Sequence, residues 1–349
     1  MASALVIAGV VGGLVGAATH DDQPPIVINR TQARPVQSAE PAVAQIQPAN
    51  VDPVAVGATV IPSIVTVEVG AASGGSFVQA GSGSGVVLDR DGHIITNHHV
   101  AEGGGTARVV LSDGRIYDAD VIGSDPLTDL AVLRISASDL EPIALGTTEG
   151  LTVGSPTIAV GSPLGLDGGP SLSVGVVSAL GREVQTGPDT VLYGMIQTDA
   201  PITSGSSGGS LVNSDGALIG ITTAVGVSNI GVEGIGFATP VEVVERVTAE
   251  IITTGSASHA LLGISGTTEY EPTDDGGIAP VGVLVRSVIP GSPAADAGIS
   301  SGNVITAIDG VHIATMDALI TELRRTGTGR ALVVSIDGAA EILVTPATA

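Results

Sequence analysis

From residue 64 onward, the chain alternates between short runs of β-branched or aliphatic residues and turns of glycine, aspartate or serine. Runs of this length and composition between turn residues predict β-strands. The 50 glycines supply the positive φ angles that tight turns between strands require. The sequence therefore predicts a mainly β fold of the barrel or sandwich kind. The expected strands are residues 64–69, 85–89, 93–96, 108–111, 130–135 and 218–222.

Two stretches, residues 241–253 and 316–325, break this pattern with the spacing of helices. The first follows Pro240, and the second has acidic Asp317 near its start and two arginines at its end. These are the preferences that the helix dipole imposes on the two ends of a helix. About ninety residues follow the first helix, which is the size of one small module.

Charge and residue usage exclude several classes of function. The formal net charge of −23 repels phosphate backbones, so no nucleic acid partner is expected. All twelve basic residues are arginine, which excludes a Schiff-base lysine. Because the chain has no cysteine, it has no thiolate nucleophile and no cysteine-based zinc site.

The N-terminal segment is long and apolar enough to cross a bilayer. Residues 2–19 carry no charge, and their length is about the minimum for a membrane-spanning helix. We expect residues 1–19 to be a transmembrane anchor, with a cleaved signal peptide or a buried core helix as alternatives. Residues 20–52 are rich in Pro, Gln, Ala and Asp without apolar periodicity, which predicts a disordered linker.

A serine hydroxyl is the one obvious nucleophile, and Ser207 lies in a glycine-rich run at residues 205–209 (GSSGG). Small residues let the backbone turn sharply and present both the Oγ and neighbouring N–H groups to a carbonyl. Alone, such a run is more typical of a linker. However, residues 96–100 (TNHHV) and 128–132 (TDLAV) precede it, so the chain order is His, Asp, Ser.

These segments resemble the chymotrypsin-like serine peptidases of the HtrA/Deg family, and the likeness covers residues 57–349. It implies two six-stranded β-barrels in residues 53–255, with the active site between them. Ser207 would be the nucleophile, His99 the base, and Asp129 the carboxylate that orients the imidazole. The N–H groups of Gly205 and Ser207 would form the oxyanion hole. Further matching segments are residues 81–86 (GSGSGV), 159–166, 173–182, 197–200 and 234–240.

The nucleophile loop departs from the family pattern. The family's Asn-Pro-Gly-Asn-Ser-Gly-Gly-Pro is here residues 203–210 (TSGSSGGS). Hydroxyl groups can hold a turn through hydrogen bonds to the backbone, but they lack the rigidity of proline. Reduced or conditional activity is therefore an open alternative.

The substrate pocket is expected near Ile202, Ile235, Gly236 and Phe237. No acidic residue stands at its expected base. We therefore expect small aliphatic side chains at P1, the substrate position before the cleaved bond, rather than Arg or Lys.

Adjacent histidines at positions 98 and 99 could suggest a metal site. Their side chains diverge in a strand or turn, and no cysteine or third histidine lies nearby. We expect no metal ion and no cofactor. The remaining histidines, expected on surfaces or in turns, are His20, His93, His259 and His312.

Residues 261–264 (LLGI) resemble the carboxylate-binding loop of PDZ domains, and residues 290–299 (PGSPAADAGI) strengthen the match. Without the second segment, LLGI would be read as a buried strand. The resemblance implies an α+β PDZ domain in residues 256–349 that adds a peptide to a sheet edge. The amides expected to hold the peptide carboxylate belong to Leu262, Gly263 and Ile264.

Together with the apolar residues 1–19, these likenesses predict a single-pass membrane protein of HtrA type with extracytoplasmic peptidase and PDZ domains. Its expected substrates are unfolded or damaged proteins, its PDZ ligands are C-terminal peptides, and it would form a homotrimer. The altered nucleophile loop motivates one alternative, a non-catalytic pseudopeptidase that acts as a chaperone or scaffold. Another is a signalling peptidase that cuts one membrane protein when a peptide occupies the PDZ groove.

Overall fold

A computed structural model describes residues 51–73, 76–102, 105–162, 169–187, 190–223, 234–337 and 340–348. The expected transmembrane anchor, residues 1–19, and the expected linker up to residue 50 lie outside these ranges. Among the described residues, no helix combines the length and the apolar character needed to cross a bilayer. All described residues belong to one compact unit, Pro48–Ala349.

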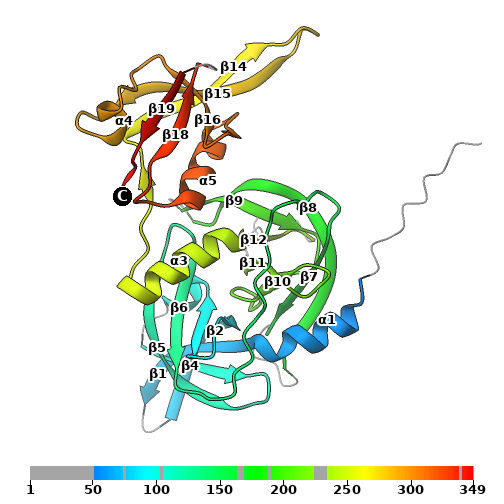
Figure 1. The fold of residues 1–349 in the computed structure, drawn as a ribbon. Helices are drawn as coiled ribbons and strands as arrows, with labels where there is room; N and C mark the ends of the chain where they lie inside the picture. Colours follow the sequence, from blue (N-terminus) through cyan, green and yellow to red (C-terminus); the bar gives the residue numbers. More distant parts are fainter. Residues whose placement is uncertain are drawn as a thin grey trace, which may run out of the picture. The chain divides into compact units, whose positions relative to one another are not determined.

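The first six strands close into an antiparallel barrel in the order β1-β2-β3-β6-β5-β4 (Figure 1). Closure occurs because β1 pairs with both β2 and β4. Alternate side chains point inward, and Val67, Ile94 and Leu133 are fully buried in this barrel's core. The strands are β1 (Ile64–Ser73), β2 (Ser76–Val87), β3 (His93–Thr96), β4 (Thr106–Leu111), β5 (Ile116–Asp125) and β6 (Leu130–Ile135).

The next six strands close a second barrel in the order β10-β11-β12-β9-β8-β7. Here β7 pairs with both β8 and β10. Its interior includes Ile196, Leu211 and Ala238. The strands are β7 (Pro156–Gly161), β8 (Ser171–Gln185), β9 (Val191–Thr198), β10 (Ser210–Val212), β11 (Leu218–Thr223) and β12 (Gly236–Pro240).

Two helices share one hydrophobic core with both barrels. Helix α1 (Pro53–Val60) begins at Asp52, whose carboxylate accepts hydrogen bonds from the first-turn N–H groups, and it continues into the 3-10 turn η1 (Ile61–Ser63). Helix α3 (Val241–Thr254) follows β12 and ends at Gly255, which has a φ of 83°. The shared core combines Val60, Ile64, Leu130, Ile158, Leu218, Val244 and Val247.

The C-terminal part has its own sheet, in the strand order β14-β15-β16-β18-β19, and its own core. Helix α5 (Met316–Thr326) contributes Leu319 to that core, and the short helix α4 (Pro293–Asp296) contributes Ala294. The strands are β13 (Ala260–Leu261), β14 (Ile264–Pro272), β15 (Ile278–Val288), β16 (Val304–Ile308), β17 (Val311–His312), β18 (Leu332–Ile336), β19 (Ala340–Val344) and β20 (Ala347–Thr348).

The prediction of a mainly β fold with two six-stranded barrels is confirmed. Five of the six expected strands lie within an observed strand, and the other, residues 85–89, overlaps the end of β2 and extends two residues beyond it. Both expected helices are present as α3 and α5. The transmembrane helix stays a prediction.

The start of α3 is tied to the turn before β7 by the carboxylate of Glu242. It accepts hydrogen bonds from the Thr148 N–H at 2.7 Å and from the hydroxyls of Thr147 and Thr148 at 3.0 and 2.8 Å. Burial by itself raises the pKa of this carboxyl, but the hydrogen bonds outweigh burial and hold the pKa below its ordinary value. The folded state therefore favours the charged form.

Glu242→Gln is expected to lower the thermal midpoint at pH 7 by about 2 to 4 °C, because a partly exposed charged hydrogen bond contributes about 1 kcal/mol. The wild-type advantage is fully present above the unfolded-state pKa and is lost as pH falls through the folded-state pKa. Scanning calorimetry from pH 7 to pH 3 measures this difference. Glu245→Gln, an exposed site on the same helix, is the matched control. An equal effect of both variants, or a difference that does not shrink in acid, contradicts the assignment.

Candidate active site

His99 and Asp129 form a close pair. His99 lies on α2 (His98–Ala101), a single helical turn after β3, and Asp129 lies in the turn between β5 and β6. His99 Nδ1 is 2.9 and 2.8 Å from the two carboxylate oxygens of Asp129, and the His99 N–H donates to Oδ1 at 3.1 Å. The Asp129 side chain is 9% exposed and the His99 side chain 46%, so only the imidazole is accessible from solvent.

The backbone of Asp129 is held in an unusual conformation, with a φ of 56°. Its carbonyl oxygen accepts hydrogen bonds from the His98 N–H at 3.1 Å and from the Asn97 side-chain amide at 2.8 Å. Asn97 is fully buried and also donates to the Thr223 hydroxyl at 3.2 Å. One amide therefore connects the histidine turn, the aspartate turn and β11 of the second barrel. Asn97 belongs to the TNHHV segment, but no local pattern in the sequence points to these contacts.

Ser207 lies in the turn between β9 and β10, and it is 5% exposed. The Ser206 N–H donates to the Thr203 carbonyl at 2.9 Å and closes this turn. Gly205 and Gly208 have φ values of 88° and 85°. A Cβ at position 208 would collide with the Ser84 carbonyl oxygen, so only glycine fits there.

His99 and Ser207 line one cleft of about 490 Å³, together with Ser204 and Gly205 of the nucleophile loop. Its remaining lining comes from β1, β2 and α2. The structure thus brings His99, Asp129, Ser207 and Gly205 into one neighbourhood from both barrels. An accessible imidazole next to a buried carboxylate, in the same cleft as a serine, is an arrangement suited to nucleophilic catalysis.

The structure separates the expected pocket residues into two groups. Ile202 contacts Gly236 so closely that a Cβ on the glycine would lie 2.5 Å from the Ile202 Cδ1 atom. Phe237 instead packs against Val184, Leu192 and Met195. Neighbouring residues of a strand point to opposite faces, so Phe237 faces away from Ile202 and Gly236. Ile235 is 38% exposed just before β12.

The turn that leads to Asp129 is held by hydrogen bonds of Asp125, His259 and Arg324. The Asp125 carboxylate accepts from the Thr128 hydroxyl and lies 3.0 Å from His259 Nε2. Burial raises the pKa of Asp125, but the hydrogen bonds of His259, Thr128 and Leu127 outweigh burial and hold the pKa below its ordinary value. Arg324 of α5 donates to the Leu127 carbonyl at 2.7 Å.

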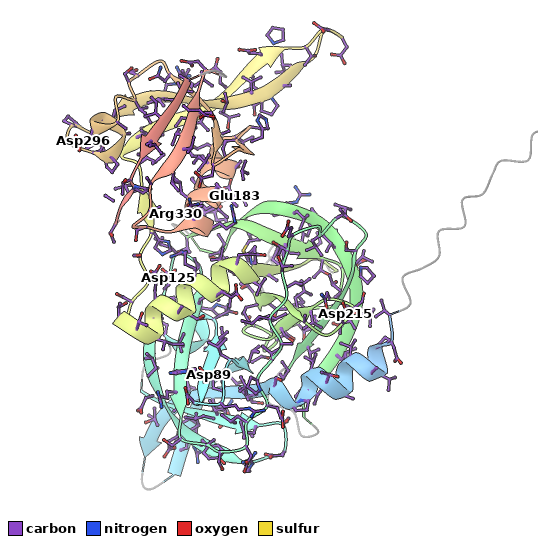
Figure 2. All side chains as sticks on the ribbon, in the orientation of Figure 1. Asp89, Asp125, Glu183, Asp215, Asp296 and Arg330 are labelled. Atoms are coloured by element: carbon purple, nitrogen blue, oxygen red, sulfur yellow. The ribbon has the colours of Figure 1, made fainter. Side chains whose placement is uncertain are left out.

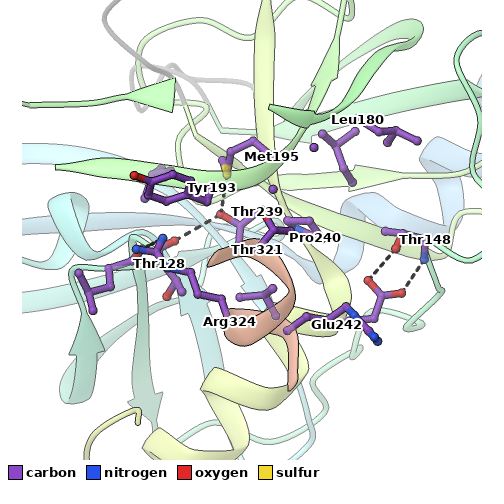
Figure 3. A pocket seen from close by; sticks show the side chains of 17 residues that line it. Thr128, Thr148, Leu180, Tyr193, Met195, Thr239, Pro240, Glu242, Thr321 and Arg324 are labelled. Atoms are coloured by element: carbon purple, nitrogen blue, oxygen red, sulfur yellow. Dashed lines mark hydrogen bonds between the residues drawn. The ribbon is translucent and has the colours of Figure 1, made fainter. Parts of the chain in front are cut away.

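Behind this turn lies a second cavity of about 200 Å³ (Figure 3). Arg324 lies on its wall, with its guanidinium 4.9 Å from the centre of the Tyr193 ring. The Thr239 hydroxyl, also on the wall, donates to the Thr128 carbonyl at 3.3 Å. The backbone on the approach to Asp129 is therefore anchored to β12 as well as to α5.

Two histidines expected on surfaces or in turns are buried, and that prediction is wrong for them. His93 is 6% exposed and His259 is 8% exposed. Each is paired with a carboxylate, His93 with Asp89 at 2.6 Å and His259 with Asp125; both aspartates are marked in Figure 2. A hydrogen-bonded partner offsets the cost of burying a polar ring. His312 is exposed, and His20 lies outside the described residues.

His98 and His99 bind different partners. His98 Nδ1 lies 3.0 Å from the Ser124 hydroxyl, and its Nε2 lies 3.4 Å from the Glu102 carboxylate. Within the described ranges, no group of three or more His, Asp or Glu side chains could share a metal ion.

The expected carboxylate-binding loop lies beside a groove of about 230 Å³. Leu262, Gly263 and Ile264 line it together with α5. The Leu262 carbonyl accepts from the Ala294 N–H, and the Gly263 carbonyl accepts from the Ile289 N–H. These backbone hydrogen bonds hold the loop to residues 289–294. Strand β14 is the last strand of its sheet, which leaves one edge next to this groove. The groove-lining residues of α5 are Met316, Leu319, Ile320 and Leu323.

Comparison with known families finds two matches. Residues 83–221 match the trypsin-like peptidase domain, and residues 284–338 match the PDZ domain. Serine protease PepD of Mycobacterium tuberculosis is 36% identical over 93% of this chain and 72% of its own length. Periplasmic serine endoprotease DegP of Escherichia coli is 39% identical over 73% of this chain, which spans only 54% of DegP.

Solved structures give the same result. HtrA-type protease AlgW with a tripeptide is 31% identical, with a TM-score of 0.66, over 85% of this chain and 97% of its own. AlgW with a decapeptide is 31% identical, with a TM-score of 0.62, over 86% of this chain and 99% of its own. A serine endoprotease from Yersinia pestis is 30% identical, with a TM-score of 0.59, over 85% of this chain and 98% of its own.

The role of the buried Asn97 amide can be measured by stability. Asn97→Ala removes the hydrogen bonds to the Asp129 carbonyl and the Thr223 hydroxyl, and the loss of such buried bonds costs about 1 to 3 kcal/mol. Urea denaturation should show this decrease in the free energy of unfolding. Asn213→Ala is the control, because water can replace its hydrogen bonds to a surface turn. We therefore expect a smaller decrease in its free energy of unfolding. Equal losses would show that Asn97 has no special structural role.

Proposed function

Because this chain belongs to the HtrA family of serine endoproteases, we propose that Ser207, His99 and Asp129 carry out its hydrolysis of peptide bonds. The observation that carries this assignment is the paired Asp129 and His99 beside Ser207 in one cleft. The roles follow the mechanism of chymotrypsin-like enzymes. A serine hydroxyl needs an adjacent base to act as a nucleophile, and His99 is the base within that cleft.

The Asp129 contact at Nδ1 favours the tautomer with its proton on that nitrogen. The Nε2 lone pair of His99 can then accept the Ser207 proton while Oγ forms a bond to the scissile carbonyl carbon. The imidazolium returns this proton to the leaving amine as the C–N bond breaks, which leaves an acyl group on Ser207. Water, deprotonated by the same imidazole, then attacks the acyl carbon; the bond from this carbon to Ser207 Oγ breaks, the imidazolium returns the proton to Oγ, and the acyl group leaves as a carboxylic acid.

We assign stabilisation of the tetrahedral intermediate to the N–H groups of Gly205 and Ser207. A fixed donor of this kind contributes on the order of 10²- to 10³-fold to kcat. Gly205 has a positive φ, which supports a sharp turn of the loop beside the nucleophile.

The proposed substrates are unfolded or damaged proteins outside the cytoplasm, cut after small aliphatic residues. Uncharged residues 2–19 and the periplasmic location in the name of DegP support this location. The contact of Ile202 with Gly236 supports an apolar P1 pocket of limited size. We also propose membrane anchoring through residues 1–19 and a homotrimer, whose mass by light scattering would be three times the 34.1 kDa of the chain.

A time course of β-casein degradation by the purified chain tests the peptidase and its nucleophile together. The wild type should degrade casein without added metal, and Ser207→Ala should lose at least about 10³-fold in rate. Asp129→Asn keeps the shape of the site but should lose on the order of 10⁴-fold, because the imidazole is held in the wrong tautomer. Ser206→Ala is the matched control and should retain activity of the same order as the wild type.

Equal degradation by the wild type and Ser207→Ala would contradict the assignment of the nucleophile. If a folded wild type cuts no casein even with a C-terminal peptide added, the pseudopeptidase alternative replaces this proposal.

We propose that the groove beside Leu262, Gly263 and Ile264 binds C-terminal peptides. Its position at the β14 edge and the peptide-bound AlgW structures support this proposal. Gly263→Ala would collide with the Ser292 side chain at a φ of 77°. We expect it to weaken binding of a peptide with a free C-terminal valine at least about tenfold in fluorescence anisotropy.

Gly276→Ala is the control for this experiment, because it has a similar φ of 85° but open space around the added methyl group. A C-terminally amidated peptide should bind neither protein tightly. Equal binding of the free and amidated peptides would contradict carboxylate recognition by this loop.

A further inference from the structure

Ser84 belongs to residues 81–86 (GSGSGV), a segment to which the proposed mechanism gives no role. It lies on β2 of the first barrel and is fully buried. Its Oγ accepts a hydrogen bond from the Ser162 N–H at 2.8 Å and donates to the Gly205 carbonyl at 2.7 Å. The Ser84 N–H also donates to the Ser207 carbonyl at 2.7 Å.

The directions of both Ser84 hydroxyl bonds are fixed by the chemistry of its partners. A hydroxyl has one proton to donate. A carbonyl oxygen and a backbone N–H can act only as acceptor and donor respectively, so the Ser84 hydroxyl donates its proton to the Gly205 carbonyl and accepts from the Ser162 N–H. The space for this contact exists because residue 161 is glycine, where a Cβ would lie 2.9 Å from the Ser84 Oγ.

Thr222 makes the corresponding contact from the second barrel. It lies on β11, is 1% exposed, and its hydroxyl donates to the Ser206 carbonyl at 2.7 Å. Its own carbonyl accepts from the Gly208 N–H at 2.8 Å. The carbonyl oxygens of three successive residues, 205 to 207, are therefore each held by a donor from outside the nucleophile loop.

We propose that the hydroxyls of Ser84 and Thr222 act as a carbonyl clamp that positions the oxyanion hole. A peptide unit is planar and trans, so the Ser206 carbonyl and the Ser207 N–H point in opposite directions. Thr222 holds that carbonyl and so fixes the direction of the Ser207 N–H. Ser84 holds the Gly205 carbonyl and thereby fixes the peptide unit whose N–H closes the turn onto Thr203.

The clamp acts on a loop that lacks the proline of the family pattern. Ser204 stands at that position, and serine leaves more backbone freedom than proline. Donors from β2 and β11 restrict the loop from outside. Ser84 and Thr222 are positioning residues, since neither is proposed to contact the reacting atoms. The inference rests on the proposed function.

The test uses the full chain with Ser84→Ala, Thr222→Val, the rescue variant Thr222→Ser, and the control Thr248→Val. Thr248 is a 2% exposed threonine on α3 whose hydroxyl donates to the Val244 carbonyl, away from the cleft. Two quantities are measured: kcat and KM for a peptide nitroanilide with valine at P1, and Ki for a peptide boronate. Boron bound to a serine oxygen imitates the tetrahedral intermediate, so Ki reports on the oxyanion hole.

Ser84→Ala and Thr222→Val are each expected to lower kcat on the order of 10- to 100-fold, with KM within about twofold of the wild type. The boronate Ki should rise by about the same factor. Thr222→Ser, which keeps the hydroxyl, should restore most of kcat, and Thr248→Val should leave it unchanged. If Ser84→Ala does not fold, the comparison of kcat and Ki between Thr222→Val and Thr222→Ser tests the clamp.

The inference is overturned if the clamp variants keep wild-type kcat, or if kcat falls while the boronate Ki stays at the wild-type value. An equal loss in Thr248→Val also overturns it, because buried hydroxyls would then support only folding. These outcomes leave the proposed function intact. Failure of the proposed function looks different: a folded wild type that neither cleaves the nitroanilide nor binds the boronate.

Discussion

Closure of the two barrels is the constraint on which the site depends. Because β1 pairs with both β2 and β4, and β7 with both β8 and β10, no strand edge within either barrel is left to join the other by pairing. The barrels therefore meet through side chains and turns, and through the hydrogen bond from the Ser84 N–H of β2 to the Ser207 carbonyl. The shared apolar core around α3 joins them, and Asn97 and Ser84 make the polar links where the cleft lies. The cleft and the polar contacts around it therefore both lie at the boundary between the two barrels.

The sequence was most informative where short-range pattern and chemistry coincide. The run at residues 130–135 is bounded by turn residues and aliphatic except for Arg134, and it is observed as β6. The ends of α3 and α5 follow from Pro240, Gly255 and the two C-terminal arginines of α5. The proposed triad residues lie in three segments that the family resemblance points to, and the structure brings these segments into one neighbourhood.

Other features depend on partners that no local pattern reveals. His259 is buried because Asp125, 134 residues earlier in the chain, lies within hydrogen-bond reach. The family resemblance of residues 234–240 predicts Phe237 in the same pocket as Gly236, but strand alternation places it on the opposite face. Asp129 has a positive φ that a long-range contact from Asn97 stabilises. The hydroxyl of Thr222 gains its role from a carbonyl sixteen residues away in the chain.

The central claim, that His99 and Asp129 activate Ser207, is tested most directly by a fluorophosphonate. Such a reagent forms a phosphonate ester with an activated serine and releases fluoride. After the labelled full chain is digested and studied by mass spectrometry, we expect one adduct, on Ser207, and much slower labelling in His99→Ala. An adduct on Ser206, or no adduct on the folded protein, would contradict it.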